Sequence, residues 1–196
     1  MRVQGSFFVG LMVAAVALMF LGLPIPAQAQ ELGPRIGTKV PDIGTPFDQT
    51  GKQRSLSSLM GEKGLVLFFV RSADWCPYCQ AQMMDLSTAN VAIERRGYKV
   101  AGISYDTPEI LSTFIERRKI AYTLLSDPKS EIIDRYELRD PQYRPGSRAY
   151  GVPRPIILIV DRTGIIKAKL YEETYQKRPP AMLVVETLDK IAAGQN

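Results

Sequence analysis

Two cysteines, Cys76 and Cys79, are the residues whose type and spacing best suit covalent chemistry in this sequence. They follow the apolar run 65–70 and open a helical pattern, so Cys76 is expected at a helix N-terminus with Pro77 in the first turn. Unpaired backbone N–H groups and the helix dipole favour a thiolate there and lower the pKa of a thiol from about 8.5. Cys79 lies one helical turn further on. We therefore predict Cys76 as the nucleophile and Cys79 as the thiol that resolves a mixed disulfide.

A purely structural disulfide is the alternative interpretation of this pair. A bridge between residues 76 and 79 closes so short a loop that it removes little entropy from the unfolded chain. The strand, Cys-x-x-Cys and helix context therefore favours redox chemistry. Pro77 and Tyr78, between the cysteines, are expected to tune the redox potential, and Trp75 is expected either to cover the site or to join the core.

Composition excludes several other kinds of site. The sequence has no histidine and only two cysteines, which rules out a Ser-His-Asp or Cys-His arrangement within the chain. It also leaves too few ligands for a tetrahedral zinc site, and Gln80 after Cys79 excludes haem attachment of the Cys-x-x-Cys-His type. We expect no cofactor and no metal. The net charge of +5 comes from scattered basic residues, so no nucleic-acid partner is expected either.

The elements that must position the cysteines alternate between strands and helices. This order predicts an α/β fold with a central mixed β-sheet flanked by helices, preceded by an N-terminal β-hairpin around residues 47–54. A polar loop is expected over 139–151, and Asp161 to Gly164 form a hairpin turn. The expected strands are 65–70, 100–104, 122–125, 156–160 and 165–170, and the expected helices begin at Pro77, Pro108, Asp127 and Pro179.

Residues 1–29 have the pattern of an export signal. Arg2 precedes the uncharged apolar run 7–23, and Ala27-Gln28-Ala29 fits the small-x-small rule for signal peptidase. An uncleaved membrane anchor, spanning through residues 7–23, is the alternative. We predict a signal peptide or anchor over 1–29, a linker over 30–38 and one domain over 39–194. The domain is expected to be exported, either periplasmic or secreted.

The segment from Phe68 through Cys79 resembles the active-site segment of the thioredoxin superfamily. The segments 100–106, 125–128 and 155–164 resemble its peroxiredoxin-like redoxin branch, the alkyl hydroperoxide reductase and thiol-specific antioxidant group. The resemblance implies a thioredoxin-like fold with a Cys-Pro-Tyr-Cys dithiol. It also implies a cis-proline before the strand beside the dithiol, at Pro155 or, failing that, Pro153. That proline would help to hold an extended partner.

The sequence departs from the family pattern at several places. Ala73 stands where peroxiredoxins carry Thr or Ser, with Ser72 one position away. Pro155 stands where they carry an arginine close to the sulfur, and the adjacent Arg154 is the candidate replacement. Val70 stands where thioredoxin has a buried Asp. No proton acceptor for Cys79 is identified, and Asp74 is a candidate only through its place in the sequence.

These departures decide the order of the functional hypotheses. The first is a thiol–disulfide oxidoreductase that cycles Cys76 and Cys79 on exported protein thiols or disulfides. The alternative is an antioxidant thiol peroxidase in which Cys76 attacks a peroxide and Cys79 resolves the sulfenic acid, with a dithiol electron donor. A non-catalytic binding module is the third. The first hypothesis is preferred because the groups that polarise a peroxide are missing from their usual positions.

Overall fold

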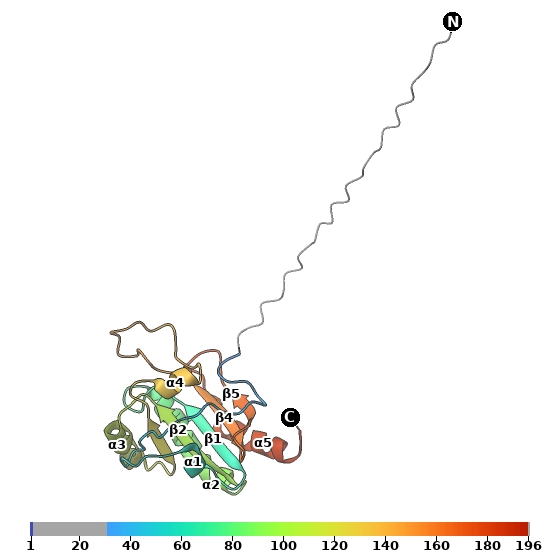
Figure 1. Ribbon diagram of the computed structural model, residues 1–196. Helices are drawn as coiled ribbons and strands as arrows, with labels where there is room; N and C mark the ends of the chain where they lie inside the picture. The colour runs from blue at the N-terminus through green and yellow to red at the C-terminus, as the bar shows by residue number, and fades with distance from the viewer. Residues whose placement is uncertain (2–30, 196) are drawn as a thin grey trace. The chain divides into compact units, whose positions relative to one another are not determined.

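The computed structural model describes residue 1 and residues 31–195 (Figure 1). The chain divides into two units, residues 1–30 and 31–196, and every described helix and strand belongs to the second. The predicted signal segment therefore lies outside the described residues, apart from Met1. None of the described helices combines the length and the hydropathy that crossing a membrane requires.

A five-stranded mixed sheet forms the centre of the domain, in the order β3-β2-β1-β4-β5. β1 pairs in parallel with β2 and antiparallel with β4, while β3 is parallel to β2 and β5 antiparallel to β4. All six residues of β1 are buried, as expected for an uninterrupted apolar run in a central strand. The strands are β1 (Gly64–Phe69), β2 (Tyr98–Ser104), β3 (Thr123–Ser126), β4 (Ile156–Asp161) and β5 (Ile166–Leu170).

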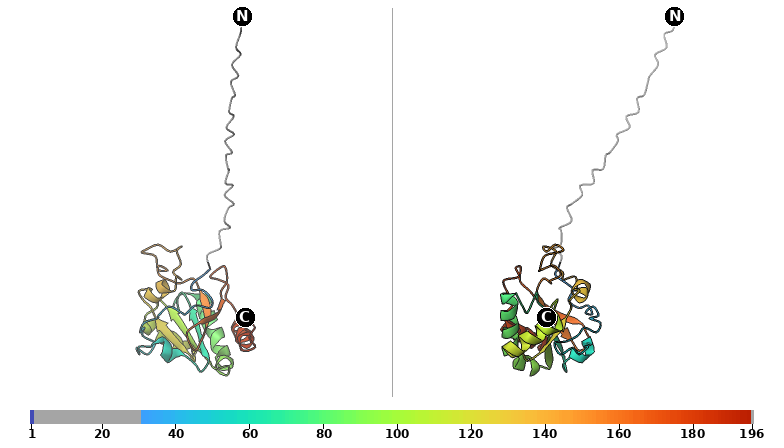
Figure 2. Two further views of the ribbon diagram at one scale, coloured as in Figure 1. Left: turned by 45° about the vertical axis from the view of Figure 1, so that its right-hand side comes forward. Right: turned by 90° about the vertical axis from the view of Figure 1, so that its left-hand side faces the viewer.

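Helices cover both faces of this sheet, and the right-hand view of Figure 2 separates the two layers. α2, α3 and α5 pack on the face formed by Val66 and Phe68 of β1, whereas α1 and α4 pack on the face formed by Leu65 and Leu67. Alternate residues of β1 thus reach two separate cores. The helices are α1 (Leu56–Leu59), α2 (Pro77–Glu94), α3 (Pro108–Arg118), α4 (Glu131–Arg135) and α5 (Ala181–Ala192).

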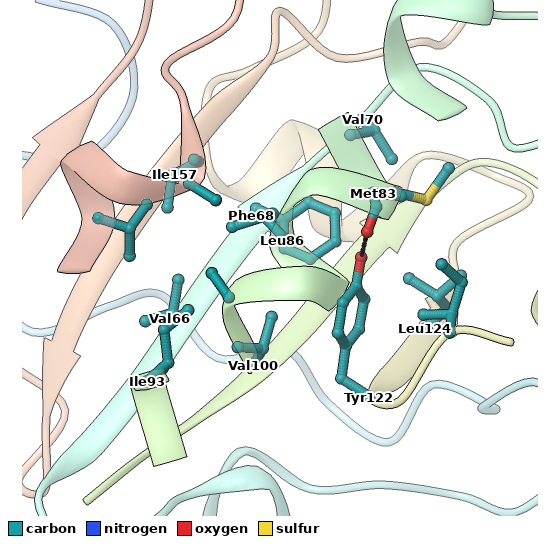
Figure 3. Packing of buried hydrophobic residues seen from close by; sticks show 14 of the residues in the cluster. Val66, Phe68, Val70, Met83, Leu86, Ile93, Val100, Tyr122, Leu124 and Ile157 are labelled. Carbon is teal, nitrogen blue, oxygen red and sulfur yellow. Dashed lines mark hydrogen bonds between the residues drawn. The ribbon is translucent and has the colours of Figure 1, made fainter. Parts of the chain in front are cut away.

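Figure 3 shows the core that supports α2. Phe68 of β1 lies among Leu86 of α2 and Tyr122, and its ring meets the Tyr122 ring edge-on at 5.6 Å between centroids. The buried Tyr122 hydroxyl donates a hydrogen bond to the Met83 carbonyl of α2 at 2.6 Å. The helix that begins with the dithiol is therefore fixed to the sheet by apolar packing and by one buried polar contact.

Most bounds differ from the sequence prediction by one or two residues, and two elements differ by more. The predicted hairpin is one tight turn, joined by a single bridge between Phe47 and Gln53 rather than by two strands. α4 begins at Glu131 instead of Asp127, because the Asp127 carboxylate accepts from the backbone N–H groups of Ile132 and Ile133 at 2.9 Å each. Asp127 therefore caps the helix from a preceding turn.

Val91 of α2 also differs from the prediction. The helical pattern placed it on the apolar face, but it is 58% exposed.

Residues 31–38, the described part of the predicted linker, pack against the domain. Leu32 is buried, and the Lys169 ammonium of β5 contacts both the Glu31 carboxylate and the Leu32 carbonyl at 3.1 Å. The Gly37 N–H donates to the Ile166 carbonyl at 2.8 Å. Residues 31–38 are thus attached to the sheet rather than separate from it.

Candidate functional site: a buried disulfide beside Arg178

The two cysteines lie where β1 leads into α2. Cys76 is the N-cap residue of α2 and Pro77 its first residue, as the sequence predicts. The sulfurs are joined in a disulfide, and the Cα atoms of the two residues are 5.2 Å apart. The Cys79 N–H donates to Cys76 Sγ at 3.2 Å, so one orphan donor of the helix end already points at the predicted nucleophile. Cys76 is 2% exposed and Cys79 is fully buried.

A buried carboxylate, Asp106, holds the loop that carries Cys76. It follows the end of β2, and its oxygens accept from the Ala73 N–H at 2.6 Å and from the hydroxyls of Ser72 and Ser104 at 2.8 and 2.9 Å. Ser72 in turn accepts from the Asp74 N–H at 3.0 Å. The turn 72–74 is therefore fixed from a neighbouring strand. Burial raises the pKa of Asp106, although the bonds from Ala73, Ser72 and Ser104 favour the charged form.

Arg71 lies within a cage of aromatic rings. Its guanidinium carbon is 3.9 Å from the Tyr175 ring centre, 4.9 Å from that of Tyr143 and 5.2 Å from that of Trp75. One amino group, Nη2, donates to the Tyr143 hydroxyl at 2.6 Å. The residue is 3% exposed, and its Nε is buried without a hydrogen-bond partner. Cation–π contacts thus hold a positive charge close to the dithiol loop.

Arg178 supplies a second cation at the disulfide itself. Its Nη2 lies 3.6 Å from Cys79 Sγ, and its Nε is also buried without a partner. It belongs to the segment 171–180 between β5 and α5, far from the cysteines in sequence. Burial, followed by repulsion from Arg71, lowers the pKa of Arg178 to about 10, so the group remains charged at neutral pH. A thiolate formed on Cys79 is stabilised by this charge.

The aromatic residues beside the cysteines have distinct places. Trp75 is half-buried, and its Nε1 donates to the Tyr105 hydroxyl at 2.8 Å. It packs edge-on against the Tyr105 ring and under Arg71, and it also packs against the core cluster that contains Cys76 and Cys79. Tyr78 is 45% exposed and meets the Tyr175 ring edge-on at 6.1 Å.

The predictions for Pro155 and Arg154 need correction. The described residues contain no cis peptide bond, so neither Pro155 nor Pro153 is the expected cis-proline. The chain there is extended, because Pro153 pairs with Arg139 and the Arg154 N–H donates to the Leu138 carbonyl at 2.7 Å. The Arg154 side chain is exposed and lines a cavity of about 540 Å³ with Pro155. The guanidinium within reach of a cysteine sulfur is that of Arg178.

Asp74, the candidate proton acceptor for Cys79, forms an ion pair at the surface. Its carboxylate is half-exposed and accepts from Arg148 Nη2 at 2.6 Å, in an ion pair at the surface. Cys79 Sγ instead has the cation Arg178 beside it. Within residues 31–195, the charged side chain that contacts a cysteine sulfur is thus the cation Arg178, which favours the thiolate form of Cys79.

Sequence reasoning missed Arg71, Asp106 and Arg178. Arg71 carried a signal, since a charged residue directly follows an apolar strand that must be buried. Asp106 and Arg178 carried no such signal, because they lie far from the cysteines in the sequence and only the fold brings them close. Among residues 31–195, no three acidic, histidine or cysteine side chains are grouped so as to hold a metal ion.

Comparison with known proteins places this site in a family. Residues 36–169 match the AhpC/TSA family. The chain belongs to the AhpC/TSA family. It is 30% identical to peroxiredoxin bcp1 of Schizosaccharomyces pombe over 132 residues, which are 67% of each chain. It is 31% identical to peroxiredoxin Bcp of Escherichia coli K12 over 132 residues, covering 66% of this chain and 83% of the relative.

Solved structures show that this AhpC/TSA chain has the thioredoxin-like fold predicted from its sequence. Peroxidoxin BcpB from Mycobacterium tuberculosis superposes with a TM-score of 0.67 at 22% identity, covering 81% of this chain and 97% of the other. A mutant of peroxiredoxin 6 from Arenicola marina superposes with a TM-score of 0.72 at 17% identity, covering 84% and 76%. The relatives indicate a redox enzyme of the peroxiredoxin branch.

Proposed function

We propose that the protein is a thiol peroxidase with Cys76 as the peroxide-reacting residue and Cys79 as the resolving residue. This exchanges the order of the two hypotheses drawn from the sequence. The observation that carries the exchange is Arg178, whose Nη2 lies 3.6 Å from Cys79 Sγ in the disulfide, because it supplies the guanidinium beside a sulfur that the sequence analysis had sought at Arg154. The likeness to curated peroxiredoxins points in the same direction.

The reaction begins with the Cys76 thiolate. Its sulfur attacks one peroxide oxygen and the O–O bond breaks, giving a sulfenic acid on Cys76 and an alkoxide or hydroxide, which takes a proton from solvent and leaves as an alcohol or water. Charge grows on the departing oxygen, and guanidinium N–H groups stabilise it. The Cys79 thiol then attacks the sulfenic sulfur and releases water. The product is the disulfide present in the structure.

Resolution needs little rearrangement in this chain. Cys76 and Cys79 are separated by one turn of α2, and their Cα atoms lie within disulfide range at 5.2 Å. A dithiol donor then closes the cycle by attacking the disulfide and leaving as its own disulfide. The deep burial of both cysteines favours a small peroxide over a folded protein as the oxidising substrate.

Stopped-flow fluorescence tests the proposal. Trp75 is the sole tryptophan and contacts Arg71, so closing the bridge is expected to change its emission. The reduced protein should be oxidised by hydrogen peroxide at least about a hundredfold faster than free cysteine, the size of effect that one preorganised donor supplies. Cys79→Ser should still form a sulfenic acid, detectable by a dimedone adduct, and Cys76→Ser should not.

Oxidation no faster than that of free cysteine would contradict the proposal. If the same preparation still exchanged rapidly with disulfides, the protein would be a thiol–disulfide oxidoreductase, as the first hypothesis holds. An organic hydroperoxide should be compared with hydrogen peroxide in the same instrument, since the proposed attack breaks the same O–O bond in both.

We also propose that the enzyme acts outside the cytoplasm. The support is the pattern of residues 1–29, with its apolar run 7–23 and the small-x-small site before Gln30. N-terminal sequencing of protein purified from its native cells should begin at Gln30. A chain that begins at Met1 and stays with the membrane fraction would instead favour an anchor.

A further inference from the structure

Two surface segments are attached to the same buried arginine, each through one tyrosine. Residues 141–148 and 171–177 lie outside the helices and strands, and all of them are exposed except Tyr143 and Tyr175, which are half-buried. These two tyrosines are the ones that contact Arg71. Its guanidinium carbon is 3.9 Å from the Tyr175 ring centre and 4.9 Å from that of Tyr143. The least exposed residue of each segment is therefore the one that joins it to Arg71.

Arg71 is suited to act as an anchor for both segments. It follows the end of β1 by two residues and is 3% exposed. It forms no salt bridge with any of residues 31–195, and its Nη2 donates to the Tyr143 hydroxyl at 2.6 Å. A planar guanidinium stacks on aromatic rings and donates hydrogen bonds from its edge. Because a buried charge without such contacts is unfavourable, the tyrosines are held against Arg71.

Both segments also reach the residues next to the sulfurs. Tyr175 meets the ring of Tyr78, which lies between the cysteines, edge-on at 6.1 Å. Arg148, at the end of the other segment, lies over the Trp75 ring at 5.6 Å, directly before Cys76 in the chain. Cys76 itself is 2% exposed. A bulky reactant therefore reaches Cys76 only if a segment moves.

We infer that Arg71 is a specificity-determining residue: by holding Tyr143 and Tyr175, it keeps the two segments closed beside the dithiol and excludes bulky oxidants. The favoured substrates are then hydrogen peroxide and short-chain alkyl hydroperoxides, and aromatic hydroperoxides react poorly. Arg71 acts through the two tyrosines, so it is a positioning residue. The choice of oxidant rests on the proposed function, whereas access to Cys76 does not depend on turnover.

Access is measured by alkylating the reduced protein with two maleimides. N-ethylmaleimide and N-(1-pyrenyl)maleimide share one reacting group and differ in bulk. The ratio of their rate constants, divided by the same ratio for free cysteine, cancels any change in the pKa of the thiol and reports steric exclusion. A bulky reagent reacts only with the open fraction of molecules, so the wild type should disfavour the pyrenyl reagent by about tenfold or more.

Substitutions of the three contacting residues test the role of Arg71. Arg71→Met removes the guanidinium from a similar volume, and the preference against the pyrenyl reagent should fall by about tenfold. Tyr143→Ala and Tyr175→Ala should each lower it by about threefold or more. Tyr175→Phe, which keeps a ring on Arg71, should retain the wild-type preference. The tyrosine variants lie in surface segments and keep the test valid if Arg71→Met does not fold.

Two other tyrosines serve as matched controls. Tyr171 is 41% exposed and belongs to the same segment as Tyr175. Tyr150 is 42% exposed, follows the other segment by two residues, and lies beside the guanidinium of Arg139 instead of Arg71. Tyr171→Ala and Tyr150→Ala should leave the preference within about twofold of the wild type. If they lower it as much as Tyr175→Ala does, closure does not depend on Arg71 and the inference is wrong.

Peroxide kinetics test the consequence for turnover. Ethyl hydroperoxide and cumene hydroperoxide are compared as oxidants, each relative to its rate with free cysteine. The wild type should favour ethyl hydroperoxide by about tenfold, and Arg71→Met should lose this preference. A wild type that does not disfavour the pyrenyl reagent, or a folded Arg71→Met variant that still does, overturns the inference. Slow oxidation by both hydroperoxides, with the maleimide preference intact, would refute the proposed function alone.

Discussion

Asp106 determines where the nucleophile lies although it does not touch it. Its carboxylate accepts hydrogen bonds from the Ala73 N–H and the Ser72 hydroxyl, three and four residues before Cys76. The same group is bound to Ser104 at the end of β2. One buried side chain therefore couples the loop of the dithiol to a neighbouring strand.

We predict that Asp106→Asn weakens both the fold and the site. One oxygen becomes an NH₂ group that faces existing donors, so at least one buried bond is lost, at a cost of about 1–3 kcal/mol. Urea denaturation should show this loss, and stopped-flow oxidation should be slower. Asp74→Asn is the matched control on the same loop, because its exposed ion pair contributes about 0–1 kcal/mol. Equal effects of the two substitutions would contradict a positioning role for Asp106.

The residues of the site differ in how far sequence could predict them. Cys76, Pro77 and Cys79 follow from local spacing, because a helix start fixes them relative to one another. Arg178 is 99 residues from Cys79, and no local rule connects the two. Arg154 was chosen for its place beside Pro155, but backbone pairing with residues 138–139 leaves its side chain at the surface. Sequence patterns do not predict side-chain contacts that depend on the path of a loop.

At the scale of elements, β1 and β2 form the support of the dithiol, and Gly102 allows them to pack. Gly102 pairs with Phe68, and a Cβ on Gly102 would meet the Phe68 ring and the Leu124 side chain. The Phe68 ring therefore occupies the space that a side chain on β2 would need. Larger residues at position 102 must displace a core aromatic directly below α2.

Gly102→Ala is expected to destabilise the protein by about 1–3 kcal/mol through overpacking. Thermal unfolding measures this as a lower Tm. Lys99→Ala, at an exposed position of the same strand, should change stability by less than about 0.5 kcal/mol. A Gly102→Ala variant as stable as the wild type would mean that the Phe68 ring can move without loss.

The turn at residues 48–54 makes a pH-dependent contribution to the free energy of unfolding. Asp48 is fully buried and, although burial raises its pKa, the hydrogen bonds from Thr50, Arg54 and Lys52 outweigh this and lower it from 3.8. A carboxylate with a lowered folded pKa stabilises the protein above pH 3.8, and the contribution is lost as pH falls through the folded pKa. Asp48→Asn should thus be less stable than the wild type at pH 7. The difference in free energy of unfolding should shrink as the pH falls below 3.8.

The elements themselves were largely predictable, and their limits were less so. The strands β1, β2 and β4 follow from apolar runs that can only be buried on two faces. The start of α4 was misplaced because Ser130 adopts a left-handed conformation and Asp127 caps the helix at a distance. Capping by a side chain several residues earlier is not visible in hydrophobic periodicity.

At the scale of the whole molecule, the contribution of residues 31–38 to stability can be tested. Leu32 is buried and the Lys169 ammonium, 3% exposed, contacts Glu31 and the Leu32 carbonyl. We predict that a chain of residues 31–196 is as stable as one that starts at Gln30. A chain that starts at Lys39 should lose about 2 kcal/mol, close to the value for burying one leucine. Equal urea midpoints for the chains that start at Glu31 and Lys39 would show that 31–38 act as a linker.

The position of the disulfide at the end of the central strand also governs how the site can open. β1 has hydrogen-bonded neighbours on both sides, and every one of its residues is buried, whereas most of segment 171–177 is exposed. Amide hydrogens of β1 are expected to exchange with solvent only when the whole domain unfolds, and those of 171–177 through small local fluctuations. We therefore expect a reactant to be admitted by movement of segment 171–180, which carries Tyr175 and Arg178, while β1 keeps its position.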